Sequence, residues 1–135
     1  MSETTDRAEI AGLFARLSRV LDEARYGDAH TVYADHVTVR SPTGGRLSGI
    51  DEVTDHLRRS RPEGERTLHL HGDVEVAVDG DRGSASATQL VYFYREGRPP
   101  HREAGVRVVC AAARTPAGWR FDAADIALVF ARPAA

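Results

Sequence analysis

The second half of the chain alternates apolar and polar residues in four long runs, and this pattern restricts the fold more than any other feature. The runs cover residues 68–78, 84–95, 103–114 and 119–130, and short turns separate them. Asp79-Gly80, between the first two runs, is typical of a tight β-hairpin. Proline- and glycine-containing turns at 95–100 and 115–118 join the later runs. The pattern predicts a long antiparallel meander.

The first part of the chain predicts helices. Apolar residues recur at helical spacing at positions 10, 13, 14, 17, 20, 21 and 24. We expect Asp6 to cap this helix, with Glu9 reaching back to it. A short second helix is expected after residues 27–28. One short strand then ends near residue 42 and a second covers 46–48, and a third helix runs to about residue 60. Ser48 and Asp51 resemble a capping box at its start.

Helices that are separate along the chain from a strand meander are typical of the α+β class. The long helix must bury its apolar side against one face of the sheet. A strongly curved sheet that is covered by helices leaves a concave, mostly apolar pocket, the usual form of a small-molecule site. With 135 residues and no linker-like segment, we expect a single domain over 1–135.

Charge and composition exclude several function classes. The formal net charge is −2, so we expect no nucleic-acid partner. We find neither a long apolar run nor a signal peptide, and therefore expect no membrane partner and a cytoplasmic location. Cys110 is the one cysteine, which excludes an internal disulfide. All 18 basic residues are arginine, which removes Schiff-base lysine chemistry.

Several local phrases, in this order, resemble the SnoaL-like family of the nuclear transport factor 2-like superfamily. They are LDEARYGD (21–28), YADHV (33–37), GIDEV (49–53), TLH (67–69), VDGD (78–81) and GWRF (118–121). The resemblance covers nearly the whole chain. It implies a cone-like α+β barrel, with three N-terminal helices packed on a strongly curved antiparallel sheet that encloses a pocket. It also implies a small hydrophobic ligand or substrate, no cofactor, and a homodimer that forms through the convex face of the sheet.

The resemblance also implies an acid–base pair. The dehydratases of this family have an Asp near the end of the first helix and a His at the start of the first long strand, which match Asp22 and His69. Their third polar residue comes from the next strand, near Tyr92 or Tyr94 here. A carboxylate that orients an imidazole suits proton abstraction next to a carbonyl. In the alternative reading, Asp22 pairs locally with Arg19 or Arg25 and His69 is a structural strand-end residue.

The direction of His69 depends on the regularity of its strand. Strict alternation places it on the polar face with His71 and Glu75, opposite Val74 and Val76. A β-bulge at Gly72 would reverse the register and turn His69 toward the pocket. Without such a bulge, we expect His69 to have no role in the pocket.

His69, His71 and Glu75 also resemble the first metal-binding motif of the cupin family. The glycine spacings differ from that motif, and the chain has no asparagine for its second half. The chain also opens with helices, whereas cupins are almost entirely strands. We therefore predict no metal, with His71 and Glu75 exposed on the polar side of the strand.

Other residues are assigned to the pocket or excluded from chemistry. We expect Leu17, Tyr33 and Val39 to line it, with Cys110 as a small apolar neighbour and Tyr94 as a hydrogen-bond donor. Tyr92 and Tyr94 are equally typical of a half-buried sheet face at a dimer contact. The ketosteroid-isomerase-like pattern is absent, because Leu17, Ser41 and Cys110 occupy its positions. Asp122 or Asp125, on the last strand, is an alternative acid.

Two functional hypotheses follow. The first is a cofactor-independent enzyme of the lyase, isomerase or cyclase type, with His69, Asp22 and Tyr92 acting on a hydrophobic, oxygenated substrate. The second is a non-catalytic module that uses the same pocket for ligand binding or the same sheet for assembly.

Overall fold

The computed structural model describes residues 2–42 and 45–133. Helix α1 (Glu3–Asp22) is followed by the 3-10 helix η1 (Tyr26–Thr31), and helix α2 (Ile50–Arg59) comes later in the chain. These are the three expected helices. Among the described residues, no helix combines the length and the apolar character that crossing a membrane requires.

Six strands form one sheet. Their bounds are β1 (Tyr33–Ser41), β2 (Gly45–Ser48), β3 (Arg66–Asp79), β4 (Arg82–Tyr94), β5 (Arg102–Thr115) and β6 (Gly118–Arg132). Their order across the sheet is β2-β1-β6-β5-β4-β3. The strands from β3 to β6 form the predicted antiparallel meander, and Gly80 supplies the left-handed turn of its first hairpin with φ +62°. In contrast to the expected antiparallel sheet, β1 pairs with β6 in parallel.

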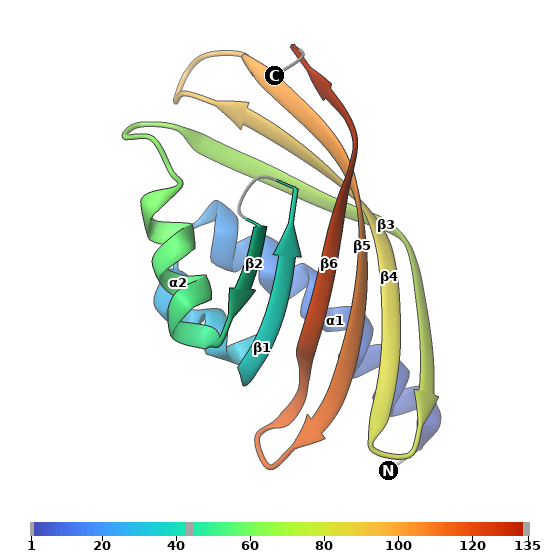
Figure 1. Cartoon of the computed structure of the whole chain (residues 1–135). Helices are drawn as coiled ribbons and strands as arrows, with labels where there is room; N and C mark the ends of the chain where they lie inside the picture. Colours follow the sequence, from blue (N-terminus) through green and yellow to red (C-terminus); the bar gives the residue numbers. More distant parts are fainter. Residues whose placement is uncertain (1, 43–44, 134–135) are drawn as a thin grey trace.

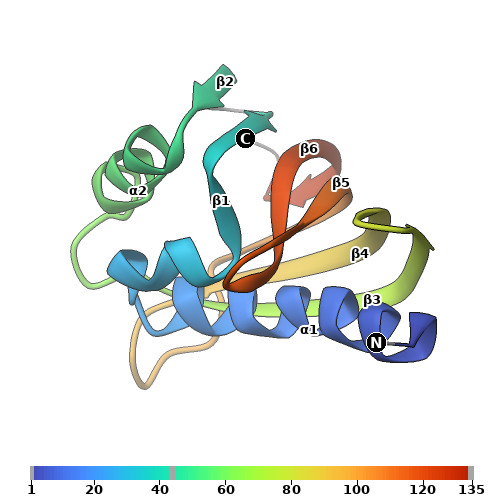
Figure 2. The ribbon, with the colours of Figure 1, turned by 90° about the horizontal axis from the view of Figure 1, so that it is seen from below.

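The sheet is strongly curved and the helices cover its concave face (Figure 1). Seen from below in Figure 2, α1 runs beneath β3 to β6. Helix α2 lies toward the opposite edge of the sheet, next to β1 and β2. The sheet is open rather than closed into a barrel, because β2 and β3 are its two edges. This arrangement is the expected cone-like α+β fold, without the closure of a complete barrel.

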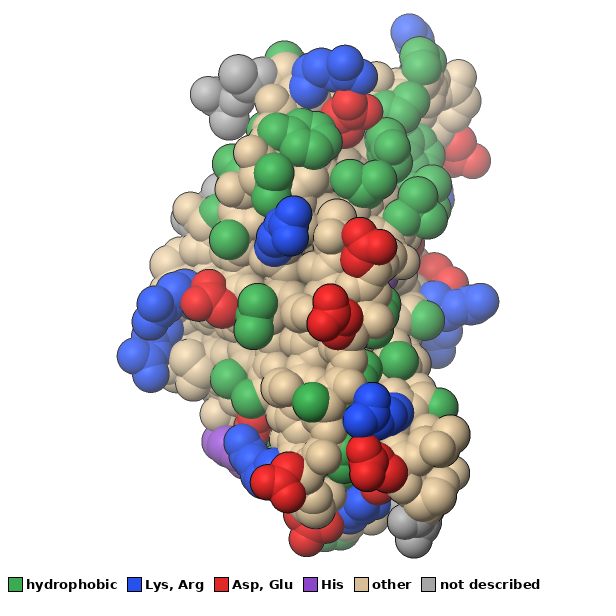
Figure 3. Space-filling model, turned by 90° about the vertical axis from the view of Figure 1, so that its right-hand side faces the viewer, with side chains coloured by type: hydrophobic (Ala, Val, Ile, Leu, Met, Phe, Trp, Pro, Cys, Tyr) green, Lys and Arg blue, Asp and Glu red, His purple; other side chains and the backbone are tan. Residues whose placement is uncertain are grey.

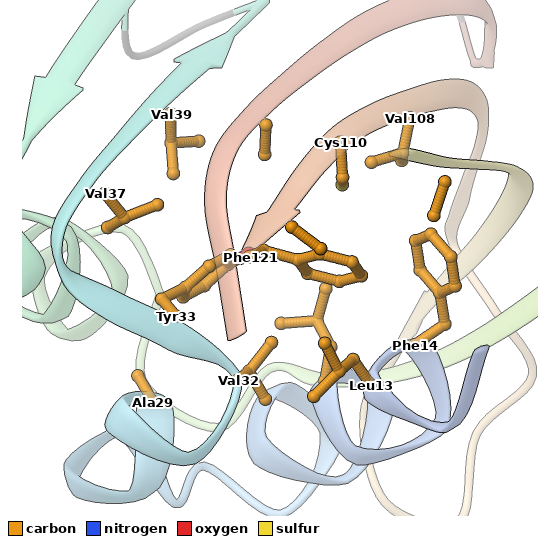
Figure 4. Packing of buried hydrophobic residues seen from close by; sticks show 14 of the residues in the cluster. Leu13, Phe14, Ala29, Val32, Tyr33, Val37, Val39, Val108, Cys110 and Phe121 are labelled. Carbon is orange, nitrogen blue, oxygen red and sulfur yellow. The ribbon is translucent and has the colours of Figure 1, made fainter. Parts of the chain in front are cut away.

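The core fills the space between α1 and the concave face of the sheet. Its largest fully buried side chains are Trp119, Phe14, Phe121, Ile10, Leu13, Val32 and Val37. Leu13 and Phe14 reach from α1 toward Phe121 (Figure 4), and the ring centroids of Phe14 and Phe121 are 5.0 Å apart. Burial of aromatic rings of this size is the main force that holds α1 on the sheet.

Both predicted helix caps are wrong. Ser2 caps α1, because its hydroxyl accepts a hydrogen bond from the Thr5 backbone N–H. Asp6 is instead a buried residue that binds Arg114 and Trp119, more than a hundred residues along the chain. At α2, Gly49 is the capping residue, and no side chain caps the helix.

Candidate active site

Asp22 and His69 form a hydrogen-bonded pair where the end of α1 meets the start of β3. Oδ1 of Asp22 lies 2.5 Å from Nδ1 of His69, and Oδ2 accepts the His69 backbone N–H at 2.9 Å. The Thr67 hydroxyl donates a third hydrogen bond to Oδ1, at 3.0 Å. The side chains are only 9% (His69) and 18% (Asp22) exposed, so the contact is shielded from water. The arginines proposed as local partners of Asp22 pair instead with Glu23 and Asp28.

These contacts determine the charge and the tautomer of the pair. Burial by itself raises the pKa of Asp22, but the hydrogen bonds from the His69 ring, the His69 backbone and Thr67 outweigh it and lower the pKa below 3.8. An ionised carboxylate accepts but cannot donate, so Nδ1 of His69 must carry a proton. The neutral ring therefore has its lone pair on Nε2, which has no hydrogen-bond partner among the described residues and is not sealed from solvent. This nitrogen is free to act as a base.

A β-bulge turns His69 inward, as the sequence required for a pocket role. The pairing of β3 with β4 shifts between Gly72 and Glu75, and Asp73 adopts a left-handed conformation with φ +50°. Before the bulge, His69 and His71 face the concave side, while Leu68 and Leu70 are about half exposed. After it, Val76 and Val78 pack against the core.

The structure corrects the expected position of His71. It was predicted on the exposed polar side of the strand, but its ring is partly buried and lies beside Phe14, with ring centroids 5.2 Å apart. Nδ1 of His71 is 2.9 Å from the Ser18 hydroxyl. His71 therefore belongs to the same concave face as His69. The signal in the sequence was the i, i+2 spacing of the two histidines, which places them on one side of a strand.

The expected roles of Tyr92 and Tyr94 are contradicted. Residues that pair directly across two strands lie on the same face, and His69 pairs with Val91. Tyr92 pairs with Leu68 and Tyr94 with Arg66, so both tyrosines lie on the convex face, away from His69. The buried concave face of β4 carries Ala85, Ala87, Gln89 and Val91 instead.

The expected pocket-lining residues are packed tightly. Leu17, Tyr33, Val39 and Cys110 are 3–6% exposed and belong to the hydrophobic core. Burial raises the pKa of the Tyr33 hydroxyl and raises the pKa of the Cys110 thiol to about 12. Cys110 therefore stays a neutral thiol, in agreement with its predicted role as a small apolar side chain. Contact between these four residues and a ligand stays a prediction.

The other acids considered as candidates lie away from the pair. Asp122 forms an ion pair with Arg82 at the start of β4, and Asp125 is exposed opposite Val109. Glu75 is exposed beyond the bulge and pairs with Ser86 on the convex face, so it does not join the two histidines. Within the described ranges, no group of three or more His, Cys, Asp or Glu side chains is arranged to hold a metal ion.

A depression lies beside Asp22, and the concave face is incompletely covered farther across the sheet. Asp22 lines a depression of about 500 Å³ together with Tyr26, Arg58, Arg61 and the loop at 62–66. On the sheet, Leu128 is on the concave face because it pairs with buried Val106, yet it is 52% exposed. The histidine end of the concave face is therefore less completely covered than the end occupied by the aromatic core.

Comparison with known proteins identifies the family. Residues 2–125 match the family model described as a SnoaL-like domain. The structure of Kfla4162 from Kribbella flavida is similar, with a TM-score of 0.87 and 22% identity over 97% of this chain and 95% of that one. No curated protein matches the sequence significantly.

Two further solved structures share the fold. The hexachlorocyclohexane dehydrochlorinase LinA Type2 has a TM-score of 0.83 and 14% identity, over 95% of this chain and 88% of that one. ActVI-ORFA from Streptomyces coelicolor has a TM-score of 0.80 and 14% identity, over 90% and 96%. At such identities the likeness shows the fold alone. The match over most of its length shows that the chain belongs to the SnoaL-like domain family.

Proposed function

We propose that this protein is a cofactor-independent enzyme of the lyase, isomerase or cyclase type that uses His69 and Asp22 for acid–base chemistry. The observation that carries the proposal is the shielded contact between Asp22 and Nδ1 of His69, which leaves Nε2 free. A carboxylate that fixes the tautomer of a histidine and stabilises its protonated form is the usual support of a histidine base.

The proposed reaction begins with proton abstraction. Nε2 of His69 takes a proton from a carbon next to a carbonyl, and the electron pair moves into an enolate. The ring is now positively charged, and the Asp22 carboxylate stabilises it across the 2.5 Å contact. The protonated Nε2 then returns its proton to a leaving hydroxyl, to another carbon, or to an oxygen formed by ring closure. All three outcomes need one base and no external oxidant or reductant.

A hydrophobic, oxygenated substrate fits the surroundings of the pair. Val91 lies directly across the strands from His69, and Leu128 exposes an apolar side chain on the same face. One protein with this fold, the dehydrochlorinase LinA, is named for an elimination from an apolar ring compound. These features favour an apolar ring or chain that carries a carbonyl group.

Deuterium exchange tests the proposal without knowledge of the natural substrate. A panel of hydrophobic cyclic ketones that includes 1-indanone is incubated with the protein in deuterium oxide, and loss of the proton signals next to the carbonyl is followed by NMR. We expect exchange above the buffer rate with at least one ketone, and its loss in His69→Gln. The matched variant His36→Gln, at an exposed histidine of β1, keeps the activity. Exchange that survives in His69→Gln contradicts the proposal, and so does the absence of exchange with every ketone.

A non-catalytic binding module of the same fold is the second candidate. The observation that favours it is the position of Tyr92 and Tyr94 on the convex face, which leaves no tyrosine of β4 beside His69. This alternative predicts that ketones bind in the presence of His69 but exchange no protons.

We also propose that two copies pair through the convex face of the sheet. Leu68, Leu70 and Val109 are 49–58% exposed on this face. Figure 3 shows apolar side chains gathered mainly at one end of it. An apolar cluster at one end of a sheet face, here Leu68 and Leu70 with their strand partners Tyr92 and Leu90, is typical of a protein–protein contact.

A further inference from the structure

His71 carries a polar atom that the fold does not use. Its Nδ1 atom is 2.9 Å from the Ser18 hydroxyl, but its Nε2 atom is sealed from solvent and has no hydrogen-bond partner among the described residues. Buried polar atoms are almost always paired, because an unpaired one loses its bonds to water without replacement. An unpaired nitrogen on the same face as the Asp22–His69 pair therefore needs a functional explanation.

The surroundings keep this ring neutral. Burial lowers the pKa of His71 to about 4, and the neighbouring His69 ring acts in the same direction. The Gln89 side chain lies close enough to the ring to raise its pKa, although no contact meets hydrogen-bond geometry at Nε2, and the charge of Asp22 also raises it; both effects are smaller than that of burial. His71 is therefore uncharged at neutral pH, which makes it a hydrogen-bonding group rather than a base. The two histidines have different environments, as expected of groups with different roles.

Ser18 can set the tautomer of His71. If the Ser18 hydroxyl donates to Nδ1, the ring proton lies on Nε2, which then becomes a donor. A neutral imidazole that donates from Nε2 can polarise a carbonyl without competing for the proton that another base removes. Ser18 is a positioning residue in this arrangement.

His71 stands in a row that leads from β3 to the open part of the concave face. The row continues across the sheet through Gln89, Val106 and Leu128, each directly opposite the next. Gln89 is 7% exposed and adds an amide to an otherwise apolar row that ends at half-exposed Leu128. A ligand that enters along this row from the Leu128 side would keep its apolar part on the sheet and bring its oxygen toward Gln89 and His71.

We propose that Nε2 of His71, assisted by the Gln89 amide, binds the carbonyl oxygen of the ligand whose neighbouring carbon faces His69. The proposal rests on the proposed function for the ligand's place on the concave face, and it assigns a polar contact that the Asp22–His69 pair does not provide. The ligand class is a hydrophobic compound with an oxygen acceptor. Because Nε2 is sealed in this structure, the ligand must displace neighbouring side chains to reach it.

Two compounds of matching shape test the assignment. 1-Indanone carries a carbonyl oxygen and indane does not, and dissociation constants for both are measured by NMR titration of the protein. We expect the wild type to bind 1-indanone about tenfold more tightly than indane, because a site built around a donor discriminates against a ligand that lacks the acceptor. In His71→Phe, which keeps a ring beside Phe14, the preference falls below about twofold.

The controls separate this contact from the proposed reaction. His69→Gln retains the preference for 1-indanone even if it loses proton exchange, and the exposed-site variant His36→Phe also retains it. In Ser18→Ala, nitrogen-15 NMR of the imidazoles shows a change in the tautomer of His71, which mere packing by Ser18 would not cause. The proposal is overturned by a wild type that binds neither compound or shows no preference for the ketone. It is equally overturned if the preference persists in His71→Phe, which is the result expected if Nε2 binds a buried water molecule and not the ligand.

Discussion

Asp22 binds His69 at two points, because one carboxylate oxygen lies 2.5 Å from Nδ1 of the ring and the other accepts the backbone N–H of the same residue at 2.9 Å. The same group therefore fixes both the strand position and the ring of His69. Rotation of the ring away from the site would break a charge-assisted hydrogen bond in a place with little access to water. The hydrogen bonds of Asp22 thus connect the end of α1 to the start of β3, in addition to the packing between the two elements.

Asp22→Asn should test the negative charge of this side chain, because it removes the charge and keeps the size and shape. The amide fills the same space, but it neither stabilises the protonated ring nor imposes a proton on Nδ1. We expect proton exchange to fall by about 10²–10⁴-fold, with an unchanged circular dichroism spectrum. Asp28→Asn, which weakens an exposed pair with Arg25, serves as the matched control. Equal activity of Asp22→Asn and the wild type would show that the carboxylate has no part in the reaction.

His71 should make the fold sensitive to mild acid. Its pKa is about 4 in the folded protein and 6.5 in the unfolded chain, so between these values the unfolded chain binds the proton and the folded one does not. Stability from this residue is therefore present above pH 6.5 and is lost as the pH falls toward 4. We expect the Tm of His71→Phe to gain about 3–6 °C relative to the wild type between pH 7 and pH 4.5. A constant difference across this range would contradict the neutral, buried ring.

The buried Asp6 should stabilise the start of α1. Its carboxylate forms two hydrogen bonds with the Arg114 guanidinium and one with the Trp119 indole N–H, and the Arg114 contact, the largest effect, lowers the pKa of Asp6. We expect Asp6→Asn to lower the Tm by several degrees at pH 7. The difference should shrink below pH 3.8, where a carboxylate with a depressed pKa loses its contribution. Glu3→Gln, at the exposed pair with Arg7, should change the Tm very little.

The convex face should determine the oligomeric state. A charge at half-exposed Leu70 would be buried in the proposed dimer, so Leu70→Glu should shift the mass in light scattering toward the 14.7 kDa of one chain. Leu128→Glu makes the same change at a residue of similar exposure on the concave face, and it should leave the dimer intact. A wild-type mass near that of one chain would rule out the dimer.

The sequence predicted the fold well, because its signals are local. The Asp79-Gly80 hairpin, the helical spacing of Leu13 and Phe14, and the family phrases each require only a few neighbouring residues. The parallel pairing of β1 with β6 has no such signal, since it joins residues that lie far apart in the chain. The role of Asp6 was missed for the same reason. Its partners are 108 and 113 residues away.

The candidate site could be predicted from the sequence only where the pairing register of β3 and β4 could be inferred. The sequence predicts that His69 faces inward only if a bulge forms at Gly72, and the structure has this bulge between Gly72 and Glu75. The same bulge brings His71 inward, because His69 and His71 are two residues apart on one strand. On β4 the predicted inward face is wrong, because both sides of that strand carry apolar residues and the sequence does not distinguish them. Only the pairing of His69 with Val91 shows that Tyr92 points away.

The most direct test is a crystal structure of the protein with 1-indanone bound. The account predicts the ring against the concave face near Val91 and Leu128, with a carbon next to the carbonyl within about 3.5 Å of Nε2 of His69. It also predicts that the contact of Asp22 with Nδ1 is preserved. A ligand bound elsewhere, or a His69 ring turned away from the ligand while Asp22 stays in place, would contradict the assignment of His69 as the base.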